Sequence, residues 1–160
     1  GWMMGSDFMR KHQMRTILLM ILSVFCLHAC SITYTISDAA TKSYKKEVMK
    51  IGDVKNVAVR FTRPEVSIEV TVSDSIPQTE MEHILALTKA YVTVENMDRV
   101  AKSVNWNSKI TRVHLRFVSD KKKEILKTYA TEYFKSYDTT DLSPENIDEY
   151  KTWREEKASW

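Results

Sequence analysis

Glycine is scarce in this chain of 160 residues, which has only three, at positions 1, 5 and 52. Loops that hold phosphate groups through backbone amides, such as GxGxxG and GxxxxGK, need several closely spaced glycines. The sequence therefore excludes dinucleotide-binding and nucleoside-triphosphate-binding loops of these two kinds.

Cysteine is equally scarce, and both copies, Cys26 and Cys30, belong to an N-terminal apolar stretch. A disulfide-stabilised scaffold needs several cysteines distributed over the domain, and a cysteine zinc site needs several close together. Neither can form in the remainder of the chain, so the stability of that part must come from packing. We expect no metal site and no cofactor.

Charge of one sign does not dominate either. The chain has 24 Lys and Arg against 21 Asp and Glu, with 43% hydrophobic and 28% charged residues. This composition is typical of a folded globular protein. Before residue 30, three residues are basic, Arg10, Lys11 and Arg15, and only Asp7 is acidic. The remainder is therefore near neutral, which argues against nucleic acid as a partner.

The apolar stretch itself runs from Ile17 to Leu27 and is interrupted only by Ser23. A basic flank followed by a short apolar core is the pattern of an export signal. The stretch has about half of the ~20 residues that a helix needs to cross a bilayer, so a permanent membrane span is the weaker interpretation. We expect residues 9–29 to form a removable signal peptide.

The end of this segment, Leu27-His28-Ala29-Cys30, resembles the lipobox of bacterial lipoproteins. In that family a branched apolar residue stands three positions before the cysteine and a small residue directly before it, while His28 departs from the usual pattern. The resemblance, which covers residues 9–31, implies that the signal is cut before Cys30 and that the Cys30 thiol is acylated, which attaches the chain to the cell membrane. Ser31, in place of an aspartate that often retains such proteins at the inner membrane, implies the outer membrane if the host is Gram-negative.

The expected organisation of the chain follows from these boundaries. Residues 1–8 have the character of an expression scar or an upstream extension, and residues 9–29 are the signal peptide. Residues 30–36 alternate apolar and polar side chains, which is consistent with an edge strand or with a tether. We expect residues 37–137 to form one domain and residues 138–160 to form a peripheral C-terminal helix.

Hydrophobic periodicity predicts the elements of this domain, because apolar residues at helical spacing indicate a helix and strict alternation indicates a strand. The expected helices are 38–51, 79–91, 95–104, 121–137 and 143–157, and the expected strands are 57–62, 66–72 and 111–117. Arg63-Pro64-Glu65 supplies the turn that joins the first two strands into a hairpin.

The fold class expected from this order is α+β. We predict a small, mostly antiparallel sheet of three or four strands, covered by amphipathic helices, with the element order α-β-β-α-α-β-α-α. A right-handed crossover is expected between the second and third strands, and the first strand is expected in the middle of the sheet.

The predicted strand 111–117 carries the main candidate for a binding surface. Arg112, His114 and Arg116 alternate with apolar residues, so they are expected on the face opposite the core. In the expected strand order, Arg60 joins them from the neighbouring strand and Glu69 supplies a counter-charge. Guanidinium groups bind oxyanions in a bidentate manner, so this surface suits phosphate, carboxylate or an anionic glycan. The alternative is a solvated sheet face whose charges are paired.

Other candidates are weaker. Tyr150 and Trp153 are expected either to form a partner surface, where buried aromatic side chains contribute most, or to pack back onto the domain. Glu80 and His83 have the ExxH spacing of half a di-iron site, but the sequence has no second such pair, and the acidic start of an ordinary helix explains them. Lys121-Lys122-Lys123 is interpreted as a solvated run in the first turn of a helix.

Two functions remain open. Because no GxSxG or SxxK motif is present, the first hypothesis is a non-enzymatic binding or assembly module of the bacterial envelope. It would be tethered to the membrane through acylated Cys30 and would hold an envelope protein or an anionic glycan. The alternative is a lipid-anchored hydrolase acting on an anionic envelope substrate, with His114 as base beside Glu69. An enzyme would place these residues around a concave pocket, whereas a binding face can be flat.

Overall fold

The computed structural model describes residues 9–17 and 31–157. It contains two compact units, Gly1–Ser31 and Ile32–Trp160. In the first unit residues 9–17 are helical, while Cys30 and the rest of the expected signal segment lie outside the described residues, so that the lipobox stays a prediction. Within the described ranges, no helix is both long enough and apolar enough to cross a membrane.

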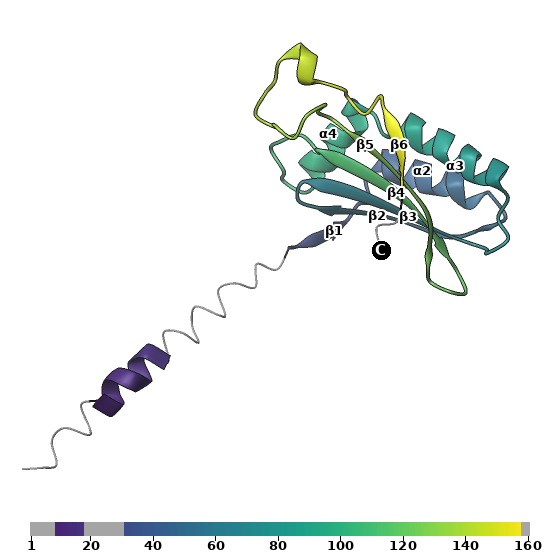
Figure 1. The fold of residues 1–160 in the computed structure, drawn as a ribbon. Coiled ribbons are helices and arrows are strands. Elements are labelled where there is room, and N and C mark those ends of the chain that lie inside the picture. Colours follow the sequence, from purple (N-terminus) through teal and green to yellow (C-terminus); the bar gives the residue numbers. More distant parts are fainter. Residues whose placement is uncertain (1–8, 18–30, 158–160) are drawn as a thin grey trace, which may run out of the picture. The chain divides into compact units, whose positions relative to one another are not determined.

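The second unit is built on one mixed sheet of six strands (Figure 1). The strands lie side by side in chain order: β1 (Thr33–Thr35), β2 (Val54–Thr62), β3 (Glu65–Val72), β4 (Arg112–Ser119), β5 (Ile125–Glu132) and β6 (Trp153–Glu156). Neighbouring strands are antiparallel except for β3 and β4, which are parallel. Parallel neighbours need a long crossover connection, and the two helices between β3 and β4 provide it.

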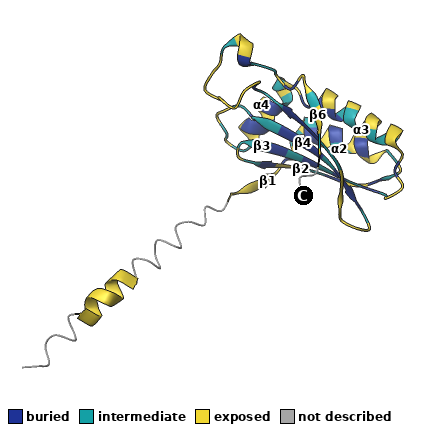
Figure 2. Cartoon of the chain, viewed as in Figure 1, coloured by how far each residue is buried: buried dark blue, intermediate teal, exposed yellow. Residues whose placement is uncertain are grey.

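Three helices, α2 (Ala39–Met49), α3 (Gln78–Tyr91) and α4 (Val94–Ser103), cover one face of this sheet (Figure 1). Alternate strand residues point towards the helices and form the core, as in β3, where Val66, Ile68 and Val70 are completely buried. Figure 2 shows this alternation of buried and partly exposed positions along the strands. Because strand side chains alternate between faces, the polar residues of the same strands collect on the other face.

Several expected elements are confirmed. α2 follows Asp38, whose carboxylate accepts hydrogen bonds from the backbone amides of Ala40 and Thr41, as an N-cap residue does. The hairpin of β2 and β3 turns where expected, and α4 matches the expected helix 95–104 to within one residue at each end. α3 begins slightly earlier than expected, with Pro77 rather than Thr79 as its N-cap residue.

The N-terminal end of the second unit forms the edge of the sheet. Thr33–Thr35 pairs with β2 as β1, which is the strand alternative for residues 30–36. The main chain continues this pairing as far as Ile36, whose amide donates to the carbonyl of Val59. Ile36 is buried, so the start of the described unit is attached to the core.

The expected fold class is wrong in the size and composition of the sheet. The sheet has six strands rather than three or four, and its centre is a parallel pair rather than an antiparallel one. β3, not the first strand of the hairpin, lies between β2 and β4. The reason is that the α3–α4 crossover returns the chain directly beside β3, so that no strand fits between β3 and β4.

The expected helix over residues 121–137 is also wrong, because this segment turns at Lys121–Lys123 and continues as β5, antiparallel to β4. The helical pattern depended in part on Ile125 and Leu126, which are 56% and 41% exposed and contribute little to the core. The centre of β5, residues 128–131, is rich in β-branched and aromatic side chains, which fit a pleated strand. Pairing with β4 therefore decides between two local conformations that the sequence allows.

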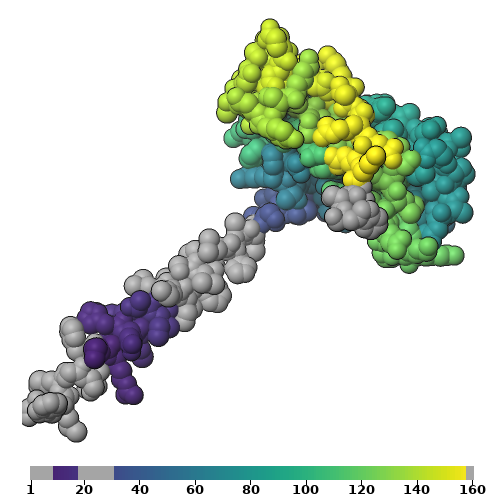
Figure 3. Space-filling model, viewed as in Figure 1, coloured from purple at the N-terminus to yellow at the C-terminus, as the bar shows by residue number. Residues whose placement is uncertain are grey.

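The expected C-terminal helix over residues 143–157 is replaced by a short 3-10 turn, η1 (Pro144–Asn146), and by β6. Ser143 and Pro144 do start a helical turn, as expected. The turn ends at Ile147, whose backbone is extended, and Glu149 and Tyr150 then have φ angles of 56° and 63°, in the left-handed region, where a right-handed helix cannot resume. Figure 3 shows the loop that contains η1 and the yellow β6 segment at the surface of this unit.

Candidate functional site

The second face of the sheet carries the charged residues singled out above, and we call it the open face because none of the described helices covers it (Figure 1). The strand register arranges its side chains in three rows. From β2 towards β6 these rows are Thr62, Glu65, Arg112 and Glu132; Arg60, Ser67, His114, Ala130 and Arg154; and Ala58, Glu69, Arg116, Thr128 and Glu156.

His114 lies at the centre of the open face and is only 7% exposed. Its Nε2 atom is 3.5 Å from a carboxylate oxygen of Glu65, and its Nδ1 atom is 3.6 Å from one of Glu156. Burial lowers the pKa of the imidazole, and Arg116 and Arg112 lower it further, against the opposing effect of Glu65. The ring is therefore neutral at neutral pH, and its Nδ1 has no hydrogen-bond partner within the described residues.

Arg112 is held by carboxylates on its β6 side. It forms a short ion pair with Glu156, and its Nε atom lies 3.7 Å from Glu132. Arg154 of β6 completes the group, since its guanidinium is 3.0 Å from Glu132 and 3.7 Å from Glu156. These four side chains therefore form a charge-balanced network rather than the cationic patch expected from the sequence.

Two arginines of the open face lack a carboxylate partner within the described residues. Arg116 contacts only the hydroxyl of Ser67, at 3.4 Å, and Arg60 is exposed. The expectation that Arg60 lies beside His114 is wrong, because β3 separates the two strands and places Ser67 between them. Arg60 and Arg116 thus offer free guanidinium groups on either side of Ser67.

The surroundings of His114 differ from those expected for its role as a base. Glu69 pairs in register with Arg116, not with His114. The carboxylates that do face the imidazole belong to Glu65 and Glu156, and both were missed because Glu65 was assigned to a turn and Glu156 to a helix. With a carboxylate beside each ring nitrogen, neither nitrogen is directed at a neighbouring serine or other nucleophile.

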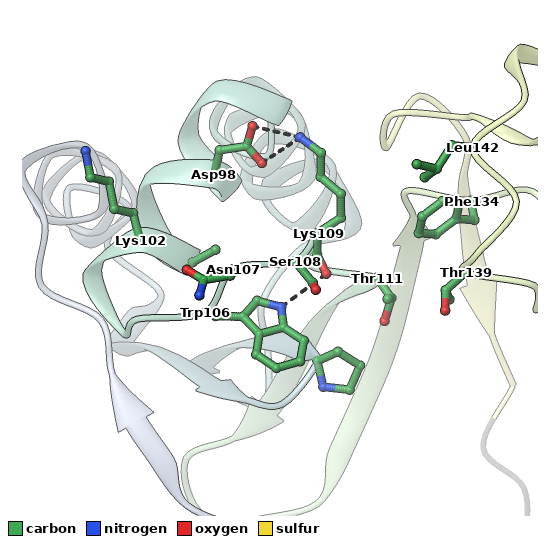
Figure 4. Close-up of a pocket in the computed structure, with 12 residues that line it drawn as sticks. Asp98, Lys102, Trp106, Asn107, Ser108, Lys109, Thr111, Phe134, Thr139 and Leu142 are labelled. Carbon is green, nitrogen blue, oxygen red and sulfur yellow. Dashed lines mark hydrogen bonds and ion pairs between the residues drawn. The ribbon is translucent and has the colours of Figure 1, made fainter.

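A cleft of about 870 Å³ opens at the end of the sheet where β4 begins (Figure 4). One wall is the loop after α4, with Trp106 and Lys109, and the other is the loop after β5, with Phe134 and Leu142. The Trp106 indole donates a hydrogen bond to the carbonyl of Lys109, at 3.3 Å. The Lys109 ammonium in turn contacts both carboxylate oxygens of Asp98, at 2.8 and 2.9 Å, so these two charges of the cleft neutralise each other.

A smaller hollow of about 450 Å³ lies against the first cleft, with which it shares Thr111, Phe134 and Thr139. Its other wall consists of residues of the open face, including Arg112 and Arg154. The loop after β5 thus lies between the cleft and the charged network. Pattern reasoning missed both hollows, because their walls are loops without a motif and the segment after β5 was expected to be helical.

The two C-terminal aromatic candidates pack onto the domain rather than forming a partner surface. Tyr150 is 3% exposed and its hydroxyl donates to the carbonyl of Ile110 at 2.6 Å, while burial raises the pKa of that hydroxyl. Trp153 is half-buried and packs against the core. Their role is therefore to attach the C-terminal segment to the sheet.

The weak metal hypothesis also lacks a ligand set. The carboxyl groups of Glu80 and Asp53 share a hydrogen bond, which raises the pKa of Glu80 and lowers the pKa of Asp53. His83 is exposed on α3. Over residues 9–17 and 31–157, no group of three or more His, Cys, Asp and Glu side chains is arranged to bind a metal ion.

Comparison with known proteins identifies no relative of this chain. No family model matches the sequence, and no curated protein or solved structure matches it significantly.

Proposed function

We propose that this protein is a lipid-anchored, non-enzymatic binding module of the bacterial cell envelope, which takes its ligand at the open face. The observation that carries the proposal is the uncovered sheet face itself, which holds a buried His114, a charge-balanced network on the β6 side and two unpaired arginines, Arg60 and Arg116. A sheet face that served only as a solvated exterior would not need to bury an imidazole among charged groups.

The ligand that fits this surface is polar and carries negative groups. Arg60 and Arg116 have no carboxylate partner among the described residues, and a guanidinium group binds an oxyanion through paired hydrogen bonds. The hollow at the edge of the network gives such a ligand a place to enter between the open face and the loop after β5. An anionic glycan, or an envelope protein with an acidic segment, has these properties.

The binding proposal is tested by NMR titration of isotope-labelled residues 31–160 with oligosaccharides of uronic acids, which serve as the anionic glycan. We expect amide shift changes along β3 and β4, and the double variant Arg60→Gln/Arg116→Gln should bind about tenfold more weakly, equivalent to about 1.4 kcal/mol. Arg99→Gln is the matched control, because Arg99 is an exposed arginine of α4 on the helical side. An equal loss of glycan affinity in the double variant and in the control would reject the open face as the binding site.

The anchor is a separate part of the proposal. It is supported by the basic flank, the short apolar core and the lipobox-like Leu27-His28-Ala29-Cys30. Two or three acyl chains on Cys30 would hold the mature chain stably on a membrane, where one chain would not. In a Gram-negative host, Ser31 makes the outer membrane the expected destination.

Metabolic labelling tests the anchor directly. Cells that express the full chain in the presence of radiolabelled palmitate should yield a labelled protein, and Cys30→Ala should abolish the label. Cys26→Ala is the control, because Cys26 would be removed with the signal peptide. A label that survives Cys30→Ala, or a native N-terminus other than residue 30, would refute the lipoprotein assignment.

One observation favours the hydrolase alternative. The lowered pKa of His114 leaves the imidazole neutral and thus able to accept a proton at neutral pH. Against it, His114 does not line the cleft or the hollow, and both of its ring nitrogens face carboxylates. Loss of an envelope-degrading turnover on His114→Ala substitution would establish the alternative and reject the binding module.

A further inference from the structure

One face of α2, together with its C-cap residue Lys50, carries four lysines around an exposed methionine. Lys42, Lys45, Lys46, Met49 and Lys50 follow the i, i+3, i+4, i+7, i+8 spacing that places residues on one side of a helix. Met49 is 45% exposed, so an apolar side chain reaches the solvent among these lysines. The opposite side of α2, which contains Thr41, Tyr44 and Val48, is buried in the core.

This lysine face has an excess of positive charge that the open face lacks. The only acidic residue within α2 is Glu47, and its carboxylate is already bound by Lys50 at 2.7 Å. Lys42, Lys45 and Lys46 have no ion-pair partner among the described residues. A surface with several free ammonium groups and one apolar side chain at its centre is complementary to an anionic lipid surface, which offers phosphate oxygens above a hydrocarbon layer.

The lysine face also lies close in sequence to the expected anchor. Residues 31–38 are all that separate Cys30 from the first residue of α2. α2 packs against β2, the strand next to the edge strand β1 that begins the unit, and beside α3 in the helical layer (Figure 1). Along the chain, α2 is therefore the first helix after the expected anchor, preceded only by the short strand β1.

We propose that the lysine face of α2 rests on anionic phospholipids and so orients the anchored domain, with its helical layer towards the membrane and its open face away from it. That the lysine face lies beside a lipid anchor rests on the function proposed above. The affinity of the lysine face for anionic lipid is independent of that function. Acyl chains hold the protein at the bilayer, and a basic surface next to them fixes which side of the domain faces the lipid. The ligand site then stays accessible to the envelope.

The affinity of the lysine face can be measured without any acyl chain. Residues 31–160 contain the whole sheet, its three helices and the entire hydrophobic core, so we expect this segment, which lacks Cys30, to fold on its own. We expect it to sediment with vesicles of phosphatidylcholine and phosphatidylglycerol, but not with vesicles of phosphatidylcholine alone. The triple variant Lys42→Gln/Lys45→Gln/Lys46→Gln should lower the partition at least about tenfold, because each lysine near an anionic surface contributes appreciably.

The matched control is Lys121→Gln/Lys122→Gln/Lys123→Gln. It removes the same charge from another exposed lysine run, at the turn between β4 and β5, and should change the partition less than about twofold. Glutamine has a helix propensity close to that of lysine, so the α2 variant keeps its fold, which circular dichroism verifies. Equal losses in the two triple variants, or no binding of the unsubstituted segment to anionic vesicles, would overturn the proposal.

The orientation is tested with environment-sensitive dyes. Residues 31–160 contain no cysteine, so Met49→Cys and Leu142→Cys each give a single labelling site. On anionic vesicles the fluorescence emission of a dye at position 49 should shift to shorter wavelength. The emission of a dye at position 142, on the wall of the cleft, should stay unchanged. The reverse result would place the cleft against the lipid and refute the proposed orientation. Because the segment lacks Cys30, neither result depends on acylation, which the palmitate experiment decides separately.

Discussion

His114 is a buried titratable side chain, and its environment makes the stability of the domain depend on pH. Burial, together with Arg116 and Arg112, lowers the pKa of its imidazole below the ordinary value of 6.5. The unfolded chain therefore binds this proton more tightly than the folded one, so acidification favours unfolding. We expect the free energy of unfolding of residues 31–160 to decrease as the pH falls below 6.5 and to level off once the pH is below the folded-state pKa.

Variants separate this effect from other titrations. His114→Gln removes the contribution of this group. The difference in unfolding free energy between wild type and variant should therefore shrink as the pH falls from about 7.5 to about 5.5, each about one unit from the ordinary histidine pKa. His83→Gln is the control, because His83 is exposed on α3. Urea titrations at each pH give the measurement. An unchanged pH dependence in His114→Gln would show that other groups cause it.

Thr41 joins two elements through a single hydroxyl. Its Oγ1 atom is 2.5 Å from the Asp38 carboxylate and 2.5 Å from the hydroxyl of Tyr91, so it donates to the first and accepts from the second. Thr41→Val keeps the shape of the side chain but leaves the buried Tyr91 hydroxyl without a partner. We expect a loss of about 2 to 3 kcal/mol in the free energy of unfolding, measured by urea denaturation.

The control for this substitution is Thr79→Val. Thr79 is exposed in the first turn of α3, so the loss there should stay within about 0.5 kcal/mol. If both variants lost the same amount, the helix propensity of valine and not the buried hydroxyl would be the cause. The capping role of Asp38 could be predicted from the sequence. The hydrogen bond between Thr41 and Tyr91 could not, because it joins two helices through residues about fifty positions apart in the chain.

β6 is a strand of only four residues, and its two consecutive glutamates test what attaches it to the sheet. Glu156 lies on the open face, where it contacts Arg112, His114 and Arg154, whereas Glu155 reaches only Lys127 at 3.8 Å. The side chain of Glu156 is 26% exposed and that of Glu155 is 55% exposed. We expect Glu156→Gln to lower the free energy of unfolding by about 1 to 2 kcal/mol and Glu155→Gln by less than about 0.5 kcal/mol.

Thermal or urea unfolding of the two variants supplies the comparison. Both variants replace a glutamate by glutamine at neighbouring positions of β6. They therefore differ only in whether the charge is removed from the open face or from the opposite side of the strand. Similar losses in both variants would mean that the network on the open face contributes no more than an exposed ion pair. In that case β6 is attached mainly by its backbone pairing with β5 and by Trp153.

The elements that could be predicted from the sequence are those whose local signals agree with their tertiary partners. β2 and β3 alternate strictly and are joined by a turn that contains proline, and α2 has its cap residue at Asp38. β5 could not be predicted, because its apolar residues also fit a helix and only the pairing with β4 selects the strand. β6 was hidden for a similar reason, since the helical turn that the sequence starts correctly ends at the extended Ile147, and left-handed backbone angles at Glu149 and Tyr150 prevent a helix from resuming.

The candidate site could be predicted only in part, because it depends on the order of the strands. Alternation along one strand is sufficient to place Arg112, His114 and Arg116 on the same face. Their partners, Glu65, Glu132 and Glu156, come from three other strands, and identifying them requires the register across the whole sheet. The site is therefore a property of the complete sheet and not of any one motif.

A site that depends on the complete sheet requires that the sheet unfolds as a unit, and two tryptophans allow this to be tested. Trp106 packs near the ring of Phe61 at one end of the core, and Trp153 lies on the edge strand β6. Within residues 31–160, Trp153→Phe/Trp160→Phe leaves Trp106 as the reporter, and Trp106→Phe/Trp160→Phe leaves Trp153. We expect both reporters to give the same urea midpoint as circular dichroism measured on the same variant, because strands β2 to β5 and all three helices share one hydrophobic core. If Trp153 became exposed at a lower urea concentration than the circular dichroism transition, β6 would open independently. The contacts of Glu156 with Arg112 and His114 would then belong to a locally unfolding segment.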